Sequence, residues 1–400
     1  MATTNPSLHS STRRWVVLLA YTAVAGVSQM LWLNFAPLIS MLQDRYEVSE
    51  FMAVSLTLVF PLLYVILSLH AGAQVDRRGY RVTVGAGAVI MAIFACVRIY
   101  DSNFYALLIG QTGIAVAQPY IVNGISKLVA DWFEEDKHGL TTGIGTIGMF
   151  LGMALALAIT PALVDTYNLQ FAMIVFAVVA VLAALIFLLT VKENETNLES
   201  HAGENEPISF KTLIRNSNLA ALFVISFLAL GFFNGLTTFL EPILAERSID
   251  AETAGLAGGM LIVGGIVGSA IVPALSDFVR RRKPFLILCA VASLFFVYPL
   301  CTAEKFNMLL VLGGITGFCF LPGYALLFAM TEEHAGAAHA GAATGILMLT
   351  GNAGGVAVVL AMEAIKGMVG NWLTSIYLMI ALLVFATLIA FRVRESIHAQ

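Results

Sequence analysis

Two acidic residues, Asp76 and Asp277, lie 201 residues apart in a chain of 400 residues, and each ends a long apolar stretch and begins a run of arginines. The first copy reads GAQVDRRGYR from residue 72, and the second reads PALSDFVRRRK from residue 273. Other residues repeat at a similar offset: Gly26 and Gly231, Pro37 and Pro242, Pro119 and Pro322, Gly143 and Gly345, and Gly152 and Gly354. One half of the chain therefore repeats the other, which predicts a duplicated helical bundle.

The composition restricts where such a bundle can fold. Hydrophobic residues make up 59% of the chain and charged residues only 12%, which is too little charge to cover a soluble surface. The chain must therefore lie in a lipid bilayer. No strongly basic face is visible, so we predict no nucleic-acid partner. The net charge of −4 says little about other partners.

The absence of certain sequence motifs argues against several classes of protein. The four cysteines lie apart in apolar stretches without the spacing of a metal site or a disulfide framework. No GxxxxGK[ST] phosphate-binding loop and no catalytic triad are visible, so we predict neither an enzyme nor direct use of ATP. We also predict no metal and no cofactor. The polar start, Met1 to Thr12, precedes an apolar stretch without a cleavage pattern, which favours a retained helix over a signal peptide.

A bilayer core is crossed by about 20 apolar residues in a helix. Twelve segments meet that condition, near residues 15–43, 50–74, 81–100, 104–132, 138–165, 168–191, 218–246, 251–279, 284–302, 306–333, 338–366 and 370–392. We predict an all-α membrane protein with a six-helix bundle in 1–191, a cytoplasmic linker in 192–217 and a second six-helix bundle in 218–400. A short surface helix is expected in the linker at Ser209 to Arg215.

Basic residues predict the orientation, because cytoplasmic loops carry an excess of lysine and arginine. With a cytoplasmic amino terminus, sixteen basic residues fall at inner ends and loops, and five fall outside: Arg45, Arg98, Arg247, Lys305 and Lys366. We therefore expect both termini in the cytoplasm and the protein in a plasma membrane, the inner membrane of a bacterium.

The loop between the second and third segments resembles the cytoplasmic gate motif GxxxDRxGxR of the major facilitator superfamily. The resemblance covers nearly the whole chain and implies two six-helix bundles that work by alternating access. It implies gate roles for Asp76, Arg77 and Arg81. In the second copy we assign the same role to Asp277 with Arg280 and Arg281. Arginines that only set the membrane orientation would explain the charges but not the repeated aspartate.

A second resemblance is narrower. Gly110-Gln111, the stretch Ala115 to Ile121 (AVAQPYI) and Asp131-Trp132-Phe133, together with Trp32, resemble the feline leukaemia virus subgroup C receptor branch of that superfamily. That branch is associated with transport of choline, ethanolamine and haem. The chain departs from it at Met149-Phe150, where an amide pair is expected, and at Asn234, where a tyrosine is expected.

The superfamily resemblance implies that segments 1, 4, 7 and 10 line the central cavity, and polar groups inside a membrane are expensive and tend to be functional. In segment 1, Trp32 is a candidate for holding a cation on its indole face, with Gln29 one turn away. In segment 4, Gln118 is a substrate candidate, and Gln111 on the same face is assigned to structural bonding. Packing is the alternative for Trp32, and interhelical bonding for Gln118.

Segment 7 carries a polar stripe, because Asn234, Thr237, Thr238 and Glu241 recur at helical spacing next to Phe233. Glu241 is a candidate counter-ion or proton site, and the following Pro242 frees a backbone carbonyl. A solvated position at the mouth of the cavity is the alternative for Glu241.

Weaker candidates lie on other segments. Tyr324 and Asn352 are candidate cavity residues in segments 10 and 11. Arg98 and Glu363 are assigned to interface or gate positions near the outer ends. Lys127 and Asp131, four residues apart, are expected to form a local ion pair or a gate element.

These patterns predict a secondary or facilitative transporter, functional as a monomer, for a small cationic or zwitterionic solute such as a choline-like amine, with protons as a candidate coupling ion. Two alternatives stay open. One is a proton-coupled transporter of an organic anion or of a haem-like, hydrophobic compound, and the other is a membrane receptor that transports nothing.

Overall fold

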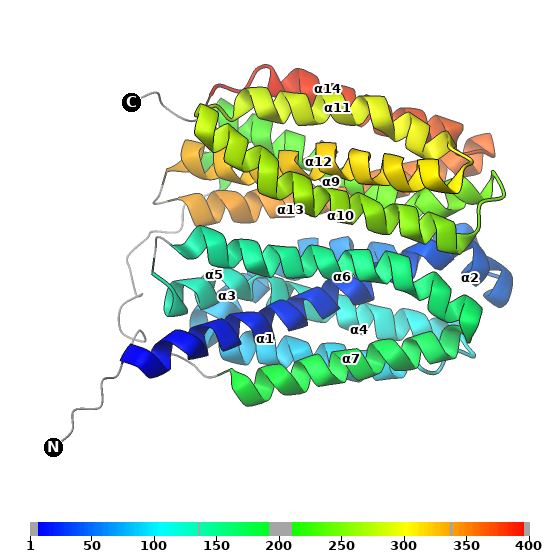
Figure 1. The fold of residues 1–400 in the computed structure, drawn as a ribbon, viewed down its shortest axis with the longest axis horizontal. Helices are drawn as coiled ribbons and strands as arrows, with labels where there is room; N and C mark the ends of the chain where they lie inside the picture. The colour runs from blue at the N-terminus through cyan, green and yellow to red at the C-terminus, as the bar shows by residue number, and fades with distance from the viewer. Residues whose placement is uncertain (1–6, 135–136, 192–209, 337–338, 396–400) are drawn as a thin grey trace. The chain divides into compact units, whose positions relative to one another are not determined.

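The computed structural model describes residues 7–134, 137–191, 210–336 and 339–395, and every regular element in these ranges is a helix (Figure 1). The helices are α1 (Ser7–Leu33), the 3₁₀ turn η1 (Ala36–Leu38), α2 (Ile39–Tyr46), α3 (Glu50–Val97), α4 (Phe104–Val122), α5 (Gly124–Trp132), α6 (His138–Thr166), α7 (Leu169–Thr190), α8 (Phe210–Leu213), α9 (Ser217–Ala245), α10 (Ala251–Val279), α11 (Lys283–Thr302), α12 (Phe306–Ala335), α13 (Ala340–Val369) and α14 (Leu373–Ala390).

The described residues contain eleven helical stretches that are long and apolar enough to cross a membrane, two of which contain a short break. One of them, α3, is 48 residues long and is interrupted at Gly79, where φ is 78° and ψ is 160°. This backbone conformation is open to glycine and strained for other residues. Gly79 thus divides α3 into two spans, which gives the twelve spans predicted from the sequence. The short helix expected before the seventh span is confirmed as α8.

Two of the predicted segments are not continuous helices. The first is broken after Leu33, where η1 and then α2 follow α1, and Pro37 lies inside η1. Proline has no N–H to donate and disfavours helical geometry in the residue before it, which accounts for the break. The fourth is broken at Asn123, four residues after Pro119, and continues as α5. The segments predicted at 15–43 and 104–132 are confirmed as candidate spans, Arg13–Tyr46 and Phe104–Trp132, and the structure adds a break inside each of them.

Contacts group the chain into two compact units, and each is described by itself. Unit 1 contains the described parts of Met1–Trp32, Ile66–Met153 and Leu163–Gly203, and unit 2 contains those of Leu33–Val65, Ala154–Ala162 and Glu204–Gln400. This grouping follows contacts rather than chain order. The division into bundles at 1–191 and 218–400, with a linker between them, remains a prediction.

In each unit, glycines bring one pair of helices into close contact. These glycines occupy equivalent positions in the two copies of the internal repeat. In unit 1, a Cβ atom added to Gly152 of α6 would lie 1.9 Å from the carbonyl oxygen of Gly26 in α1. In unit 2, a Cβ atom on Gly354 of α13 would lie 1.9 Å from the carbonyl oxygen of Phe227 in α9. The repeat therefore includes the helix packing, since equivalent glycines remove the side chain at equivalent interfaces.

Candidate functional site

In unit 1, the three predicted substrate residues are buried. Trp32, Gln29 and Gln118 are 8%, 5% and 4% exposed. Trp32 is the last residue but one of α1 and directly precedes the break in the first span, while Gln118 precedes Pro119 and the break in the fourth. Broken helices are where transporters place substrate sites, because the break frees backbone polar groups inside the membrane.

Two hydrogen bonds fix α1 against α4 on either side of Gln118. The Gln111 amide Nε2 donates to the carbonyl oxygen of Leu31 at 2.9 Å, and the Tyr21 hydroxyl donates to that of Val122 at 3.2 Å. The structural role predicted for Gln111 is confirmed. Leu31 precedes Trp32, so this bond also positions the backbone beside the candidate tryptophan.

Arg98 differs from the expectation of an interfacial position near an outer end. Its side chain is 0% exposed, and its Nη1 donates to Oε1 of Gln111 at 2.6 Å. A guanidinium is tolerated in such a place because a charge-assisted hydrogen bond replaces part of its hydration. Arg98 therefore belongs to the interior of unit 1, and it extends the chain of bonds from Leu31 through Gln111.

In unit 2, the polar stripe of α9 is buried along its length. Asn234, Thr237, Thr238 and Glu241 are between 2% and 5% exposed. The Thr237 hydroxyl donates to the carbonyl oxygen of Phe233, one turn earlier, at 2.8 Å. The solvated position considered for Glu241 is excluded by its 5% exposure.

Glu241 has a specific partner. Its Oε2 accepts the backbone N–H of Ser40 at 3.1 Å, in the first turn of α2. The first N–H groups of a helix have no partner within the helix, and a carboxylate is favourable there because of the helix dipole. Glu241 thus caps the short helix that follows the break in the first span. This contact joins residues 201 positions apart, and hydropathy gave no sign of it.

Phe233, Asn234, Tyr324 and Asn352 lie in a cluster of aromatic and amide side chains from α9, α12 and α13. The rings of Phe233 and Phe320 are parallel within 5°, with centroids 6.2 Å apart, and Phe320 also contacts Phe232 at 4.8 Å. The Tyr324 hydroxyl donates to Sδ of Met348 at 3.6 Å. Phe320 was missed from the sequence, although it lies one turn before Tyr324 on the same helix.

The two amides of this cluster differ. Asn352 donates to the carbonyl oxygen of Met348 at 2.9 Å, within its own helix. Asn234 is 2% exposed and lies beside Gly355, yet neither atom of its side-chain amide has a hydrogen-bond partner among the described residues. A buried amide without a partner costs about 1–3 kcal/mol, so Asn234 is suited to binding a polar group that enters the site.

A further charged group of unit 2 lies at the end of α13. Lys366 contacts Glu50 at 3.2 Å, and its ammonium lies 5.4 Å from the centroid of the Trp372 ring. Glu363, one turn before Lys366, has a buried Oε2 without a hydrogen-bond partner in the part of the chain that the structure describes.

The first predicted gate loop is exposed. Asp76, Arg77 and Arg81 all have exposed side chains, and no ion pair within 4 Å joins any of them to another described residue. The loop is fixed instead by its neighbours. Trp132 donates its indole N–H to the Tyr80 hydroxyl, and the expected ion pair next to it, Lys127 with Asp131, is confirmed at 3.3 Å.

In the second gate loop, the aspartate pairs with an arginine outside the predicted gate residues. Asp277 forms its ion pair with Arg282, not with Arg280 or Arg281, and Arg282 also contacts Glu333 at 3.0 Å. Helix α10 ends at Val279, and the next residue, Arg280, has a left-handed backbone conformation with φ of 55°. Arg280 and Arg281 contribute backbone bonds to the end of the helix, which leaves Arg282 as the partner of both carboxylates.

No group of three or more histidine, cysteine, aspartate or glutamate side chains that could hold a metal ion occurs among the described residues. The four cysteines, Cys96, Cys289, Cys301 and Cys319, are free.

Comparison with known proteins adds three findings. A family model described as the Major Facilitator Superfamily matches residues 18–246 and 222–399. The choline/ethanolamine transporter flvcr2a of Danio rerio is 26% identical over 415 residues, covering 97% of this chain and 88% of the relative. The choline/ethanolamine transporter FLVCR1 of Mus terricolor is 27% identical over 359 residues, covering 80% of this chain and 64% of the relative.

Two further matches extend the comparison. An uncharacterized protein of Archaeoglobus fulgidus is 30% identical over 223 residues, which is 56% of this chain and all of the relative. The crystal structure of a bacterial homologue of the human lysosomal transporter Spinster matches with a TM-score of 0.73 and 16% identity, over 95% of this chain and 97% of that one. At that identity the structural match establishes the fold alone.

Proposed function

The chain belongs to the major facilitator superfamily, and on that premise we propose that it is a transporter of a small ammonium compound of the choline or ethanolamine class. The observation that carries this proposal is the similarity to choline/ethanolamine transporters over almost the whole chain. The proposed mechanism is alternating access, in which two bundles expose one site to each side of the membrane in turn.

The residues of the candidate sites suit such a substrate. A quaternary or primary ammonium binds to aromatic faces, which offer about 0.5–1 kcal/mol at exposed sites and about 2 kcal/mol or more when desolvated. We assign this role to Trp32 in unit 1 and to the aromatic cluster of Phe233, Phe320 and Tyr324 in unit 2. The hydroxyl group of such a solute needs hydrogen bonds, for which we assign Gln29, Gln118, Asn234 and Asn352.

We propose that the charge state of Glu241 is linked to the conformation of the protein. Its carboxylate caps α2 through Ser40, and this bond weakens when the carboxylate takes up a proton or turns towards a cation. A proton or the substrate itself then competes with the helix end for Glu241. Proton coupling through this residue is therefore part of the proposal, as are cytoplasmic termini, a monomeric state and a bacterial inner-membrane location.

The test of substrate class compares binding of choline with binding of 3,3-dimethylbutanol, its uncharged isostere, to purified protein. Trp32→Leu should weaken choline binding about five- to thirty-fold, since leucine keeps apolar bulk but lacks the ring quadrupole. Trp32→Phe should lose less. Binding of the uncharged compound should change little in either variant.

Trp15→Leu is a matched control, because Trp15 lies in the same helix, against Phe133, away from the break. It should leave choline affinity unchanged. Equal losses for choline and its isostere in Trp32→Leu would assign Trp32 to packing. Absence of choline and ethanolamine binding in the wild type, with binding of an organic anion instead, would overturn the substrate class.

A further inference from the structure

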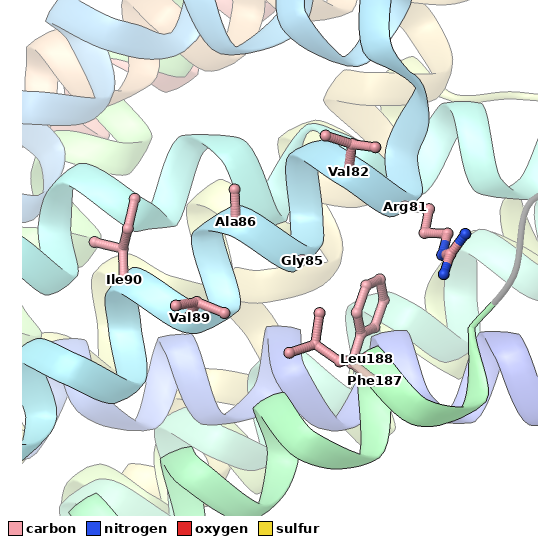
Figure 2. Close-up of a pocket in the computed structure, with 8 residues that line it drawn as sticks. All are labelled: Arg81, Val82, Gly85, Ala86, Val89, Ile90, Phe187 and Leu188. Carbon is pink, nitrogen blue, oxygen red and sulfur yellow. The ribbon is translucent and has the colours of Figure 1, made fainter.

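A groove of about 610 Å³ lies on the surface of unit 1, between α3 and α7 (Figure 2). Its sides are apolar: Val82 and Val89 come from α3, and Phe187 and Leu188 from α7. Arg81 is the one charged residue among those that line it, and Figure 2 shows its guanidinium at one end of the groove, on the side of Phe187. The volume is in the range of ligand-binding pockets, about 300–1,000 Å³.

Small residues lie at the centre of the groove. A Cβ atom on Gly85 would lie 3.2 Å from Cδ2 of Leu188, so the glycine lets α7 approach α3 closely there, and Ala86 beside it is exposed. Along α3 the groove extends from Arg81 to Ile90, nine residues or about 14 Å. The hydrocarbon core of a bilayer is about 30 Å thick, so the groove has the length of one leaflet.

The charged end of the groove is available to a ligand. Arg81 is exposed, and no carboxylate lies within 4 Å of it among the described residues. Arg77 and Arg78, in the part of α3 just before Gly79, are also exposed. An arginine beside an apolar groove at the predicted cytoplasmic interface matches a phosphate attached to an acyl chain, since guanidinium and phosphate form charge-assisted hydrogen bonds.

We propose that this groove binds one anionic phospholipid of the inner leaflet, with an acyl chain against Gly85 and Ala86 and the phosphate on Arg81. The proposal concerns unit 1 alone and holds whatever solute the protein transports. A phospholipid satisfies both parts of the groove, whereas free phosphate would use only the arginine and a neutral lipid only the apolar part.

The test uses the full chain, purified in detergent and freed of lipid, with phosphatidylglycerol and phosphatidylcholine of identical acyl chains as probes. Native mass spectrometry measures the bound fraction at increasing lipid concentration. The wild type should bind phosphatidylglycerol more tightly than phosphatidylcholine. Arg81→Gln should weaken phosphatidylglycerol binding about fivefold, the usual contribution of one basic residue at an anionic membrane surface, and Arg81→Lys should keep most of it.

The apolar part is tested separately by Ala86→Phe, which places a ring in the groove from an exposed position and should weaken binding of both lipids. Two controls match these variants: Arg392→Gln removes an exposed arginine elsewhere, and Val267→Phe adds a ring to an exposed position of α10. Both should bind like the wild type, and melting temperatures without lipid should confirm that all variants fold. Equal binding of the two lipids by the wild type, or unchanged phosphatidylglycerol binding in Arg81→Gln, would overturn the proposal. So would an inorganic phosphate titration that displaces bound phosphatidylglycerol completely, because it would assign the site to the phosphate group alone.

Discussion

Adding one methyl group to four glycines tests whether the internal repeat extends to helix packing. Gly152 of α6 and Gly354 of α13 face carbonyl oxygens at 1.9 Å from an added Cβ atom. Gly143 and Gly345 lie on the same two helices, and an added Cβ atom there meets nothing within 4 Å. The four positions thus form two matched pairs, each with one crowded and one open glycine.

The expected magnitude follows from two opposing contributions. Alanine stabilises a helix interior by about 0.8–1 kcal/mol relative to glycine, and this gain applies at all four positions. At the crowded positions, relieving an overlap of well over 1 Å moves two backbones apart, and overpacking of this kind costs about 1–3 kcal/mol. Gly143→Ala and Gly345→Ala should therefore be neutral or slightly stabilising. Gly152→Ala and Gly354→Ala should each be about 1–3 kcal/mol less stable than the open variant on the same helix.

The assay is thermal unfolding of the four purified variants in one detergent, with solute transport in vesicles as a second measurement. Comparison within a helix cancels the propensity contribution, so the difference in melting temperature reports the close contact. Transport should fall in the crowded variants, since separating α1 from α6 or α9 from α13 displaces candidate substrate residues. Equal melting temperatures for Gly152→Ala and Gly143→Ala would refute the close approach of α1 and α6.

Three further outcomes are expected. Asp76→Asn should impair transport in reconstituted vesicles without lowering the melting temperature, and normal turnover in this variant would remove the gate role. Asp277→Asn should impair transport less, because its partner Arg282 keeps Glu333 as a second carboxylate. Glu241→Gln should abolish dependence on a proton gradient while solute exchange continues, and full gradient-driven accumulation in this variant would eliminate the coupling role. The N–H of Thr253 lowers the pKa of Asp250 at the start of α10, so the carboxylate stabilises the fold above about pH 4 and loses this effect as the pH falls through the lowered pKa. Asp250→Ala should therefore cost about 0.5–2 kcal/mol of stability at neutral pH. A cost that persists unchanged in melts at pH 3 would contradict this cause.

Hydropathy alone was enough to predict most of the helices. The predicted segment 251–279 coincides with α10, and the family inferred from the gate loop is confirmed by the matching family model. These features could be predicted because the length of an apolar run and a glycine that must turn are local properties of a sequence. The break at Pro37 is also a local feature, because a proline inside a predicted span marks a point where the helix can be interrupted.

The contacts within the candidate sites could not be predicted in this way. Hydropathy says that a helix is buried in lipid, but not which helix lies beside it. The bond between Ser40 and Glu241, the ion pair of Asp277 with Arg282 and the place of Phe320 in the aromatic cluster all depend on such neighbours. Arg98 shows the same limit, because its position near the end of an apolar run suggested an interface, whereas Gln111 holds it inside.

The bonded chain from Arg98 through Gln111 to Leu31 restricts how this protein can diverge. Loss of the arginine alone leaves a buried amide oxygen without this donor, and loss of the glutamine alone leaves a buried guanidinium without this acceptor, so either single change is costly. A pair of apolar residues that replaces both at once is far less costly. Positions 98 and 111 should therefore change together among descendants of this sequence, and lineages in which only one of them has changed should be rare.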